Sequence, residues 1–198
     1  MSEISAAMVK ELRVKTGAGI MDCKAALAES GADLEKAVDF LRKKGLATAQ
    51  KRAGRAMSEG VIESYIHMGG KIGVMVEINC ETDFVAKTDD FHEFAKNIAM
   101  HIAATAPAGI VPEDVSQELI EREKEIYRAQ VLEMGKPEKM ADKIVEGKLA
   151  KFMKECCLLD QAYVKNPSTS IKDYLNEVIA KTGENITIKR FARFQLGD

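Results

Sequence analysis

Hydrophobic positions repeat with two different periods along the chain, and the change of period divides the sequence. Over the first 45 residues, apolar side chains recur every three or four positions, as they do on the buried face of a helix. Boundary signals separate these stretches: Ser5 can cap the first, Thr16-Gly17 ends it, and Asp33 can cap the third. We expect Gly45 to end the third helix. The pattern therefore predicts a compact three-helix module over residues 1–45.

Beyond residue 58 the period becomes two, which is typical of strands. Residues 61–67 and 72–79 flank a short turn that contains two glycines, so they predict a β-hairpin. Residues 91–103 return to the helical period and predict a helix that covers the hairpin. Residues 185–195 alternate again and have no neighbouring strand in sequence, so we expect them to pair with the hairpin. Apolar rows on the other face of this sheet favour a homodimer.

Two long helical stretches lie between these parts of the sheet. Pro112 is expected to start the first, Gly135 to end it, and Pro137 to start the second. Both have narrow apolar stripes spaced near seven, which predicts that they pack on each other as an antiparallel helical hairpin over residues 113–157. A loop at 166–168 should precede the last helix, which Gly183 closes. The fold class is α+β, with a small three-stranded antiparallel sheet covered by helices and a protruding helical hairpin.

A basic stretch joins the module to the rest of the chain. Six basic residues and no acidic ones occur here: Arg42, Lys43, Lys44, Lys51, Arg52 and Arg55. We interpret residues 46–57 as a solvated basic linker helix, followed by a core and dimerisation domain over 58–198; docking to a protein partner or to RNA is the alternative. No aromatic residues interleave to stack bases, and the net charge is −2, so we expect no direct nucleic-acid partner.

Composition gives no sign of a cofactor, a metal site or a membrane anchor. The four cysteines and three histidines have no zinc-binding spacing, and no apolar run approaches the length of a membrane span. No secretory signal opens the chain, so we expect a soluble cytoplasmic protein. Carboxylates at Glu81, Asp83, Asp89 and Asp90 follow a strand, as in some metal-dependent enzymes. Without a phosphate-binding loop or a paired nucleophile and base, however, we expect no enzyme.

Residues 79–87 are the most distinctive stretch of the chain. They lie between the predicted hairpin and the helix that begins near Asp89, so both ends should be fixed. Phe84 stands beside Asp83 at this junction. From the residues alone, Phe84 either folds back into the core or projects as an apolar wedge, and the two alternatives stay open.

Several segments together resemble one known family, bacterial elongation factor Ts, in order and spacing over essentially the whole chain. The matching segments are residues 16–24, 79–87, 98–101, 135–137 and 145–147. The length is similar to the short form of that family, which is a homodimer through its sheets. Ile20 departs from the longer form, which usually has Met there, but it keeps the apolar bulk.

The resemblance implies a guanine-nucleotide exchange factor that binds elongation factor Tu, displaces Mg²⁺ and promotes release of GDP so that GTP can rebind. The segment Thr82, Asp83, Phe84 and Val85 would intrude near the partner's magnesium site. The first module would be similar to a ubiquitin-associated domain, and the helical hairpin would match the family's coiled coil. By the same resemblance, the residues that contact the partner would be Arg13, Ile20, Met21, Lys24 and His101.

Overall fold

The computed structural model describes residues 4–52, 54–134 and 138–197, and these form two compact units. The first unit comprises the chain up to Glu63, with Glu77–Ala95 and Asp173–Lys189. The second comprises Ser64–Val76, Lys96–Lys172 and the chain from Arg190 onward. Three strands and two helices continue from one unit into the other, so the units share elements and are not successive domains.

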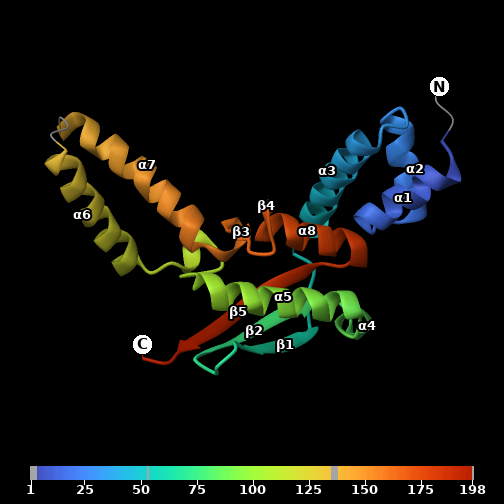
Figure 1. Cartoon of the computed structure of the whole chain (residues 1–198). Helices are drawn as coiled ribbons and strands as arrows, with labels where there is room; N and C mark the ends of the chain where they lie inside the picture. Colours follow the sequence, from blue (N-terminus) through green and yellow to red (C-terminus); the bar gives the residue numbers. More distant parts are fainter. Residues whose placement is uncertain (1–3, 53, 135–137, 198) are drawn as a thin grey trace. The chain divides into compact units, whose positions relative to one another are not determined.

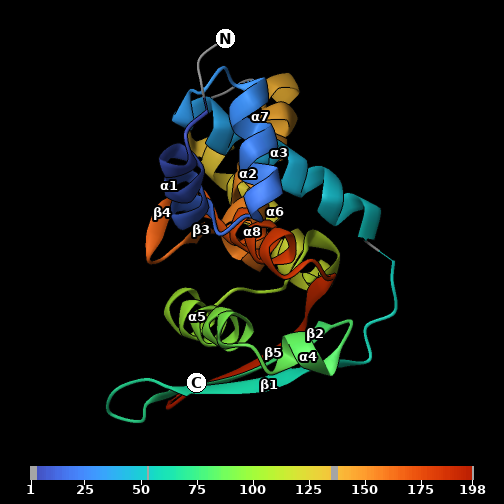
Figure 2. The same cartoon turned by 90° about the vertical axis from the view of Figure 1, so that its right-hand side faces the viewer.

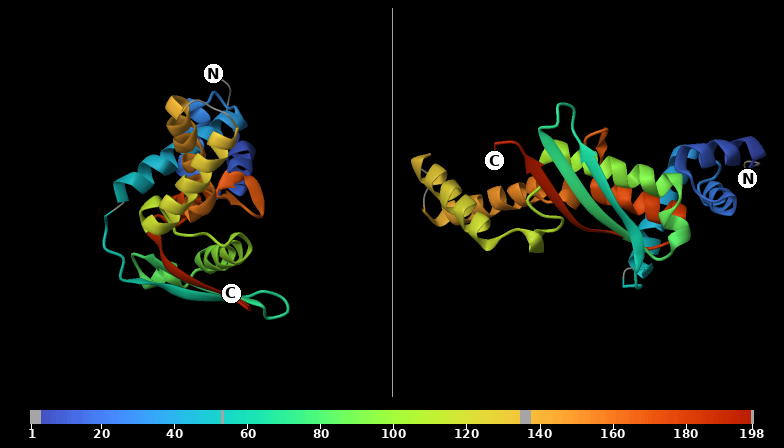
Figure 3. Two further views of the ribbon diagram at one scale, coloured as in Figure 1. Left: turned by 90° about the vertical axis from the view of Figure 1, so that its left-hand side faces the viewer. Right: turned by 90° about the horizontal axis from the view of Figure 1, so that it is seen from below.

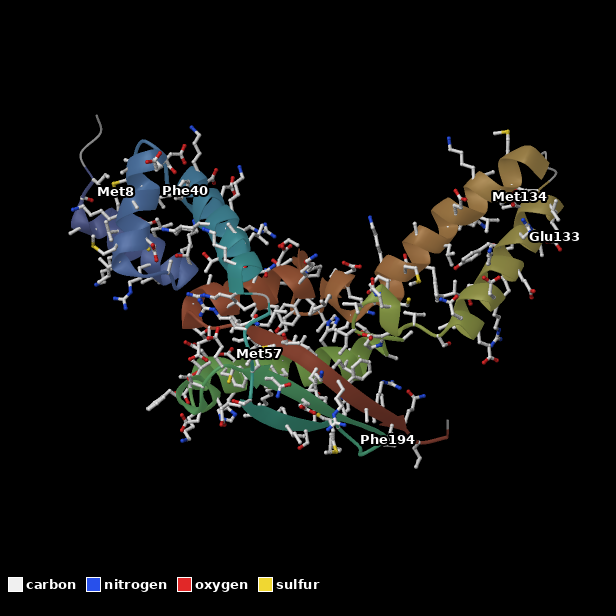
Figure 4. All side chains as sticks on the ribbon, turned by 180° about the vertical axis from the view of Figure 1, so that it is seen from behind. Met8, Phe40, Met57, Glu133, Met134 and Phe194 are labelled. Carbon is white, nitrogen blue, oxygen red and sulfur yellow. The ribbon has the colours of Figure 1, made fainter. Side chains whose placement is uncertain are left out.

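The first three helices form the predicted module. They are α1 (Ala6–Thr16), α2 (Ile20–Glu29) and α3 (Leu34–Arg52), and Figure 2 shows them packed together. Ser5 caps α1 by accepting a hydrogen bond from the backbone N–H of Met8 at 3.2 Å, which confirms the predicted start. The core of the module consists of Leu12, Cys23, Ala26, Leu27 and Ala37, with Met8 and Phe40 packed against it (Figure 4).

The predicted end of the third helix at Gly45 is wrong, because α3 continues through this residue to Arg52. Gly45 is buried, and a Cβ atom placed on it would lie 3.3 Å from the Cβ of Ala180 in α8 (Ile171–Thr182). The glycine therefore lets two helices approach closely instead of ending one of them. The basic linker helix expected over 46–57 is the last part of α3 followed, from Gly54, by non-helical chain.

The fold contains a three-stranded antiparallel sheet, as predicted, which Figure 3 shows from below. Its strands are β1 (Glu59–Ile66), β2 (Ile72–Cys80) and β5 (Ile186–Gln195), in the order β1-β2-β5, so the last strand does pair with the hairpin. Figure 2 shows α5 (Asp89–Thr105) along one face of this sheet. Alternate side chains of β2 are buried, namely Val74, Val76, Ile78 and Cys80. The alternating pattern thus assigned the inner face correctly.

Gly60 marks a very close approach between β1 and β2. Its φ angle is +149°, and a Cβ atom built on it would lie 2.1 Å from the backbone oxygen of Ile78. Neither that conformation nor that distance accommodates any side chain. The close approach of the two strands therefore requires glycine at this position.

The helical hairpin consists of α6 (Gln117–Glu133) and α7 (Glu138–Cys156), which lie side by side in Figure 1. Val131, Ala141 and Val145 are buried between them. Pro112 does not start the helix: it opens a 3₁₀ turn, η1 (Pro112–Asp114), and α6 begins after Ser116, whose side chain caps it. The predicted boundaries at Gly135 and Pro137 lie outside the described residues. Glu133 and Met134 mark the far end of α6 in Figure 4.

The segment between α7 and α8 contains more structure than the sequence predicted. A second 3₁₀ turn, η2 (Leu158–Asp160), is followed by the short antiparallel pair β3 (Ala162–Tyr163) and β4 (Asn166–Ser170). The loop predicted at 166–168 is therefore wrong, because these residues belong to β4. Among the described residues, no helix has both the length and the apolar character needed to cross a membrane.

Candidate functional site

A short helix that the sequence pattern did not predict carries the most distinctive residues of the chain. This helix, α4 (Asp83–Ala86), lies between the end of β2 and the start of α5 (Figure 1). Thr82 caps it: the Thr82 hydroxyl accepts a hydrogen bond from the backbone N–H of Val85 at 3.4 Å. A four-residue helix is too short to show a hydrophobic period, and the only sequence signal for it was Thr followed by Asp.

The two faces of α4 differ sharply in exposure. Phe84 is 80 % exposed, whereas Val85 and Ala86 are buried. Val85 and Ala86 therefore anchor the helix while the Phe84 ring projects into solvent. Of the two alternatives left open by the sequence, the structure supports the projecting wedge.

Two carboxylates hold the start of α4 to the chain just before β5. The Glu184 carboxylate accepts hydrogen bonds from the Thr82 backbone N–H at 3.0 Å and from the Thr82 hydroxyl at 2.6 Å. In the opposite direction, the Glu81 carboxylate accepts the backbone N–H of Asn185 at 2.7 Å. Sequence reasoning missed Glu184, because it lies 102 residues from Thr82 and no local pattern connects them.

Arg55 adds a third group to this cluster from the segment after α3. Its Nη1 lies 3.3 Å and 3.4 Å from the two carboxylate oxygens of Glu81. The hydrogen bond from Asn185 and the nearby guanidinium lower the pKa of Glu81 below its usual range, so its carboxylate is ionised at neutral pH.

Two acidic residues near α4, Asp83 and Asp90, each form an ion pair with a lysine. Asp83 forms an ion pair with Lys87 at 2.6 Å, and this hydrogen bond lowers the pKa of Asp83. Asp90 pairs with Lys181 at 2.6 Å. Within the described part of the chain, no group of three or more Cys, His, Asp or Glu residues is arranged to hold a metal ion.

Cys80, at the end of β2, is a packed thiol. Burial raises its pKa to about 11, and its Sγ donates to the Thr82 carbonyl oxygen at 3.2 Å. The thiol is therefore protonated at neutral pH, which is the wrong state for a nucleophile.

The candidate contact residues of the module lie near the turn between α1 and α2. Arg13 is exposed in the last turn of α1, and Ile20, Met21 and Lys24 are exposed in the first turns of α2. Ile20 is 54 % and Met21 75 % exposed, so two adjacent apolar side chains face solvent here. The structure therefore brings these four residues to one end of the module.

His101 differs from the other candidate residues, because it is 0 % exposed. Its Nε2 lies 2.9 Å from Gln161 Oε1, and its Nδ1 accepts the backbone N–H of Val164 at 3.3 Å. Burial lowers the pKa of His101, so the ring is neutral at physiological pH. In this arrangement His101 supports its surroundings and presents no atom to a partner.

The second unit exposes apolar side chains on and beside its strands. Ile66, Met75 and Phe194 are exposed on β1, β2 and β5, and Figure 4 labels Phe194 near the end of β5. The Ile66 Cδ1 lies 3.1 Å from the Cβ position of Gly73, so Ile66 covers part of β2. The homodimer expected from the sequence stays a prediction, and these residues are its candidate contacts.

Comparison with known proteins identifies the family. A family model described as Elongation factor TS matches residues 45–198. The chain belongs to the elongation factor Ts family. It is 71 % identical over 198 residues to Elongation factor Ts of Desulfosudis oleivorans, with all of both chains covered. It is 63 % identical over 195 residues to Elongation factor Ts of Syntrophobacter fumaroxidans, with 98 % of each chain covered.

Membership in the elongation factor Ts family makes the chain a translation elongation factor. The family model begins at residue 45, close to the end of the three-helix module, whereas the alignments with the relatives also include that module. The recognition that rested on short segments of the sequence is thus confirmed over the full length.

Proposed function

We propose that the chain is a guanine-nucleotide exchange factor that binds elongation factor Tu, displaces the Mg²⁺ of that GTPase and promotes release of GDP, so that GTP can rebind. The observation that carries the proposal is the Phe84 ring, which is 80 % exposed on a helix anchored at both ends. A large apolar ring held in water contributes little to folding, so its use lies in a complex.

Exchange follows from linkage between two binding equilibria. A protein that binds the nucleotide-free GTPase more tightly than the GDP-bound form must weaken GDP binding by the same factor. Burial of a phenylalanine side chain in a partner supplies about 1.5–3 kcal/mol. That is about a 10- to 100-fold change in an equilibrium constant. One well-placed ring is therefore enough to shift the nucleotide affinity substantially.

The other residues of the segment have separate tasks in this proposal. Thr82 caps α4, and Val85 anchors it from the buried side. In the complex, Asp83 leaves its ion pair with Lys87 and binds polar groups of the partner instead. These bonds would hold the partner in the conformation from which Mg²⁺ has been displaced. It does not compete for Mg²⁺ as a ligand, since Mg²⁺ requires several oxygen ligands in near-octahedral geometry and a single carboxylate supplies too few.

We assign the three-helix module, residues 1–45, to docking. It would act as a ubiquitin-associated-like domain that contacts the GTPase through the exposed Arg13, Ile20, Met21 and Lys24. The remainder of the chain, 58–198, would form the core and the dimer interface, and the helical hairpin would act as the family's coiled coil.

For His101 we propose an indirect role. Its ring holds the backbone of Val164, which is exposed, so it shapes a surface next to β3 and β4 without touching the partner. This differs from the direct contact that the resemblance implied.

The proposed homodimer would form through the sheet, where Ile66, Met75 and Phe194 are exposed. Two copies would then present two Phe84 wedges.

The factor works in the cytoplasm, needs no cofactor, and makes or breaks no covalent bond. It is therefore not an enzyme, although each copy acts many times.

The test measures GDP release directly. Elongation factor Tu loaded with a fluorescent GDP analogue is mixed with excess unlabelled GDP and increasing amounts of the chain. We expect the wild-type chain to accelerate release, and Phe84→Ala to reduce the maximal acceleration about 10-fold or more. Circular dichroism checks that the variant is folded. An unchanged release rate with Phe84→Ala would refute the wedge, and no acceleration by the wild-type chain would refute exchange itself.

A further inference from the structure

We propose that Glu184 is a positioning residue for exchange: it forms, together with Glu81, a reciprocal clamp that holds α4 rigid while Phe84 presses on the partner. This inference rests on the proposed exchange function and assigns a role within it to residues outside the Thr82–Val85 segment. The clamp consists of two neighbouring pairs, Glu81 with Asn185 and Thr82 with Glu184.

The geometry of the clamp is unusually complete for a surface junction. Each carboxylate accepts the backbone N–H of a residue on the other segment, at 3.0 Å for Thr82 and 2.7 Å for Asn185. Glu184 also accepts the Thr82 hydroxyl at 2.6 Å. Hydrogen bonds to carboxylate oxygens are shorter and stronger than those between neutral groups, and three of them join the two segments here. The residues immediately before α4 and immediately before β5 are thereby tied together.

A wedge on α4 needs such a clamp. A helix of four residues has almost no stability of its own, because the nucleating turn is unfavourable and few bonds follow it. Phe84 is 80 % exposed, and Val85 and Ala86 are the residues of α4 that are buried. Without a fixed cap, the free energy gained by burying Phe84 in the partner would unravel α4 instead of displacing partner groups.

Arg55 connects the clamp to the segment that leaves α3. Its Nη1 contacts both carboxylate oxygens of Glu81. The same carboxylate also accepts the hydrogen bond from the backbone N–H of Asn185. The chain that carries the docking module is therefore bonded to the residue immediately before the cap of the wedge helix. The Arg55 side chain therefore links the segment after the docking module to the residue that precedes the wedge helix.

The experiment compares Glu184→Ala with Glu184→Gln in the GDP-release assay on the full chain. Glu184→Ala removes every acceptor, and we expect the maximal release rate to fall about tenfold while the half-saturating concentration changes less than about threefold. Glu184→Gln keeps the shape and one acceptor oxygen, so its maximal rate should lie between those of Glu184→Ala and the wild type.

Hydrogen exchange gives a second readout that does not depend on the partner. In Glu184→Ala, the backbone amides of residues 82–87 should exchange faster, whereas the amides of α1 and α2 should keep their wild-type rates. Glu93→Ala serves as the matched control, because Glu93 is exposed on α5 and the substitution removes the same charge.

Each outcome decides the proposal. If Glu184→Ala keeps the wild-type maximal rate while Phe84→Ala loses it, the clamp is refuted and the exchange function stands. If only the half-saturating concentration rises, Glu184 acts in binding and the positioning role is refuted. If Glu184→Ala fails to fold, Glu184→Gln carries the test, and a wild-type maximal rate with that variant overturns the clamp. If the wild-type chain does not accelerate release, the exchange function itself has failed.

Discussion

Phe84 and His101 reverse the usual placement of their side chains, and they do so for different reasons. Phe84 is a large apolar residue that is 80 % exposed, while His101 is a polar residue that is fully buried. Folding accounts fully for His101, because both of its ring nitrogens have hydrogen-bond partners. Nothing in folding accounts for the exposed ring of Phe84. An exposed apolar or a buried polar side chain therefore points to function only when contacts within the fold do not explain it.

The surroundings of His101 and of Phe84 also differ in how many elements contribute to them. The surroundings of His101 come from α5, η2 and the β3–β4 turn, and they would change only if these elements moved apart. The surroundings of Phe84 are solvent on one side and a clamped helix on the other. Substitution of the histidine should therefore affect the stability of the fold, and substitution of the phenylalanine should affect only the exchange.

The largest expected effect on folding comes from removing His101. His101→Ala leaves Gln161 and the Val164 N–H without their partner and opens a cavity, so we expect the free energy of unfolding to fall by about 2–4 kcal/mol. Urea denaturation measures this. His92→Ala is the matched control, because His92 is exposed on the same helix. A loss in His92→Ala as large as that in His101→Ala would contradict the contrast.

A smaller effect should appear when the pH is lowered. Burial lowers the pKa of His101, so below the ordinary value of 6.5 the unfolded chain takes up a proton that the folded chain does not. The stability that the neutral ring provides is present above that value and is lost as the pH falls below it. Urea denaturation at roughly pH 7.5 and 5.5 should show the loss. His101→Gln should show a weaker dependence on pH, and an equal dependence in both proteins would exclude His101 as the cause.

The smallest expected effect is that of Phe84→Ala on the fold. Because the ring is exposed and alanine favours helix, the free energy of unfolding should change by less than about 0.5 kcal/mol. The same urea experiment measures it. A clear destabilisation would mean that Phe84 packs on the chain in solution, and the contrast with His101 would then disappear.

Local signals in the sequence predicted most of the elements. Ser5 and Asp33 mark helix starts because their side chains bond to the backbone N–H groups that follow them. The alternation along β2 identified the buried face, since successive side chains of a strand point to opposite sides. These features depend on neighbours in sequence, which is why one chain was sufficient.

The features that the sequence did not reveal depend on distant contacts. Gly45 was interpreted as a helix end because glycine is a common stop signal, but its reason is the approach of Ala180. Glu184 had no visible purpose until the fold placed it on Thr82. The two-residue strand β3 is too short for any period, so its pairing with β4 was equally hidden. The resemblance to a family singled out residues 82–85, and the structure showed which distant residues hold them in place.

The close approach of β1 to β2 at Gly60 restricts which residue can occupy that position. A side chain at that position would meet backbone, and backbone cannot rotate aside as a side chain can. Compensating changes elsewhere offer no relief, because the obstacle is an atom that every amino acid has. Substitutions on the exposed faces of α4, of the module and of the helical hairpin meet no such obstacle, whereas any side chain at Gly60 would force the two strands apart.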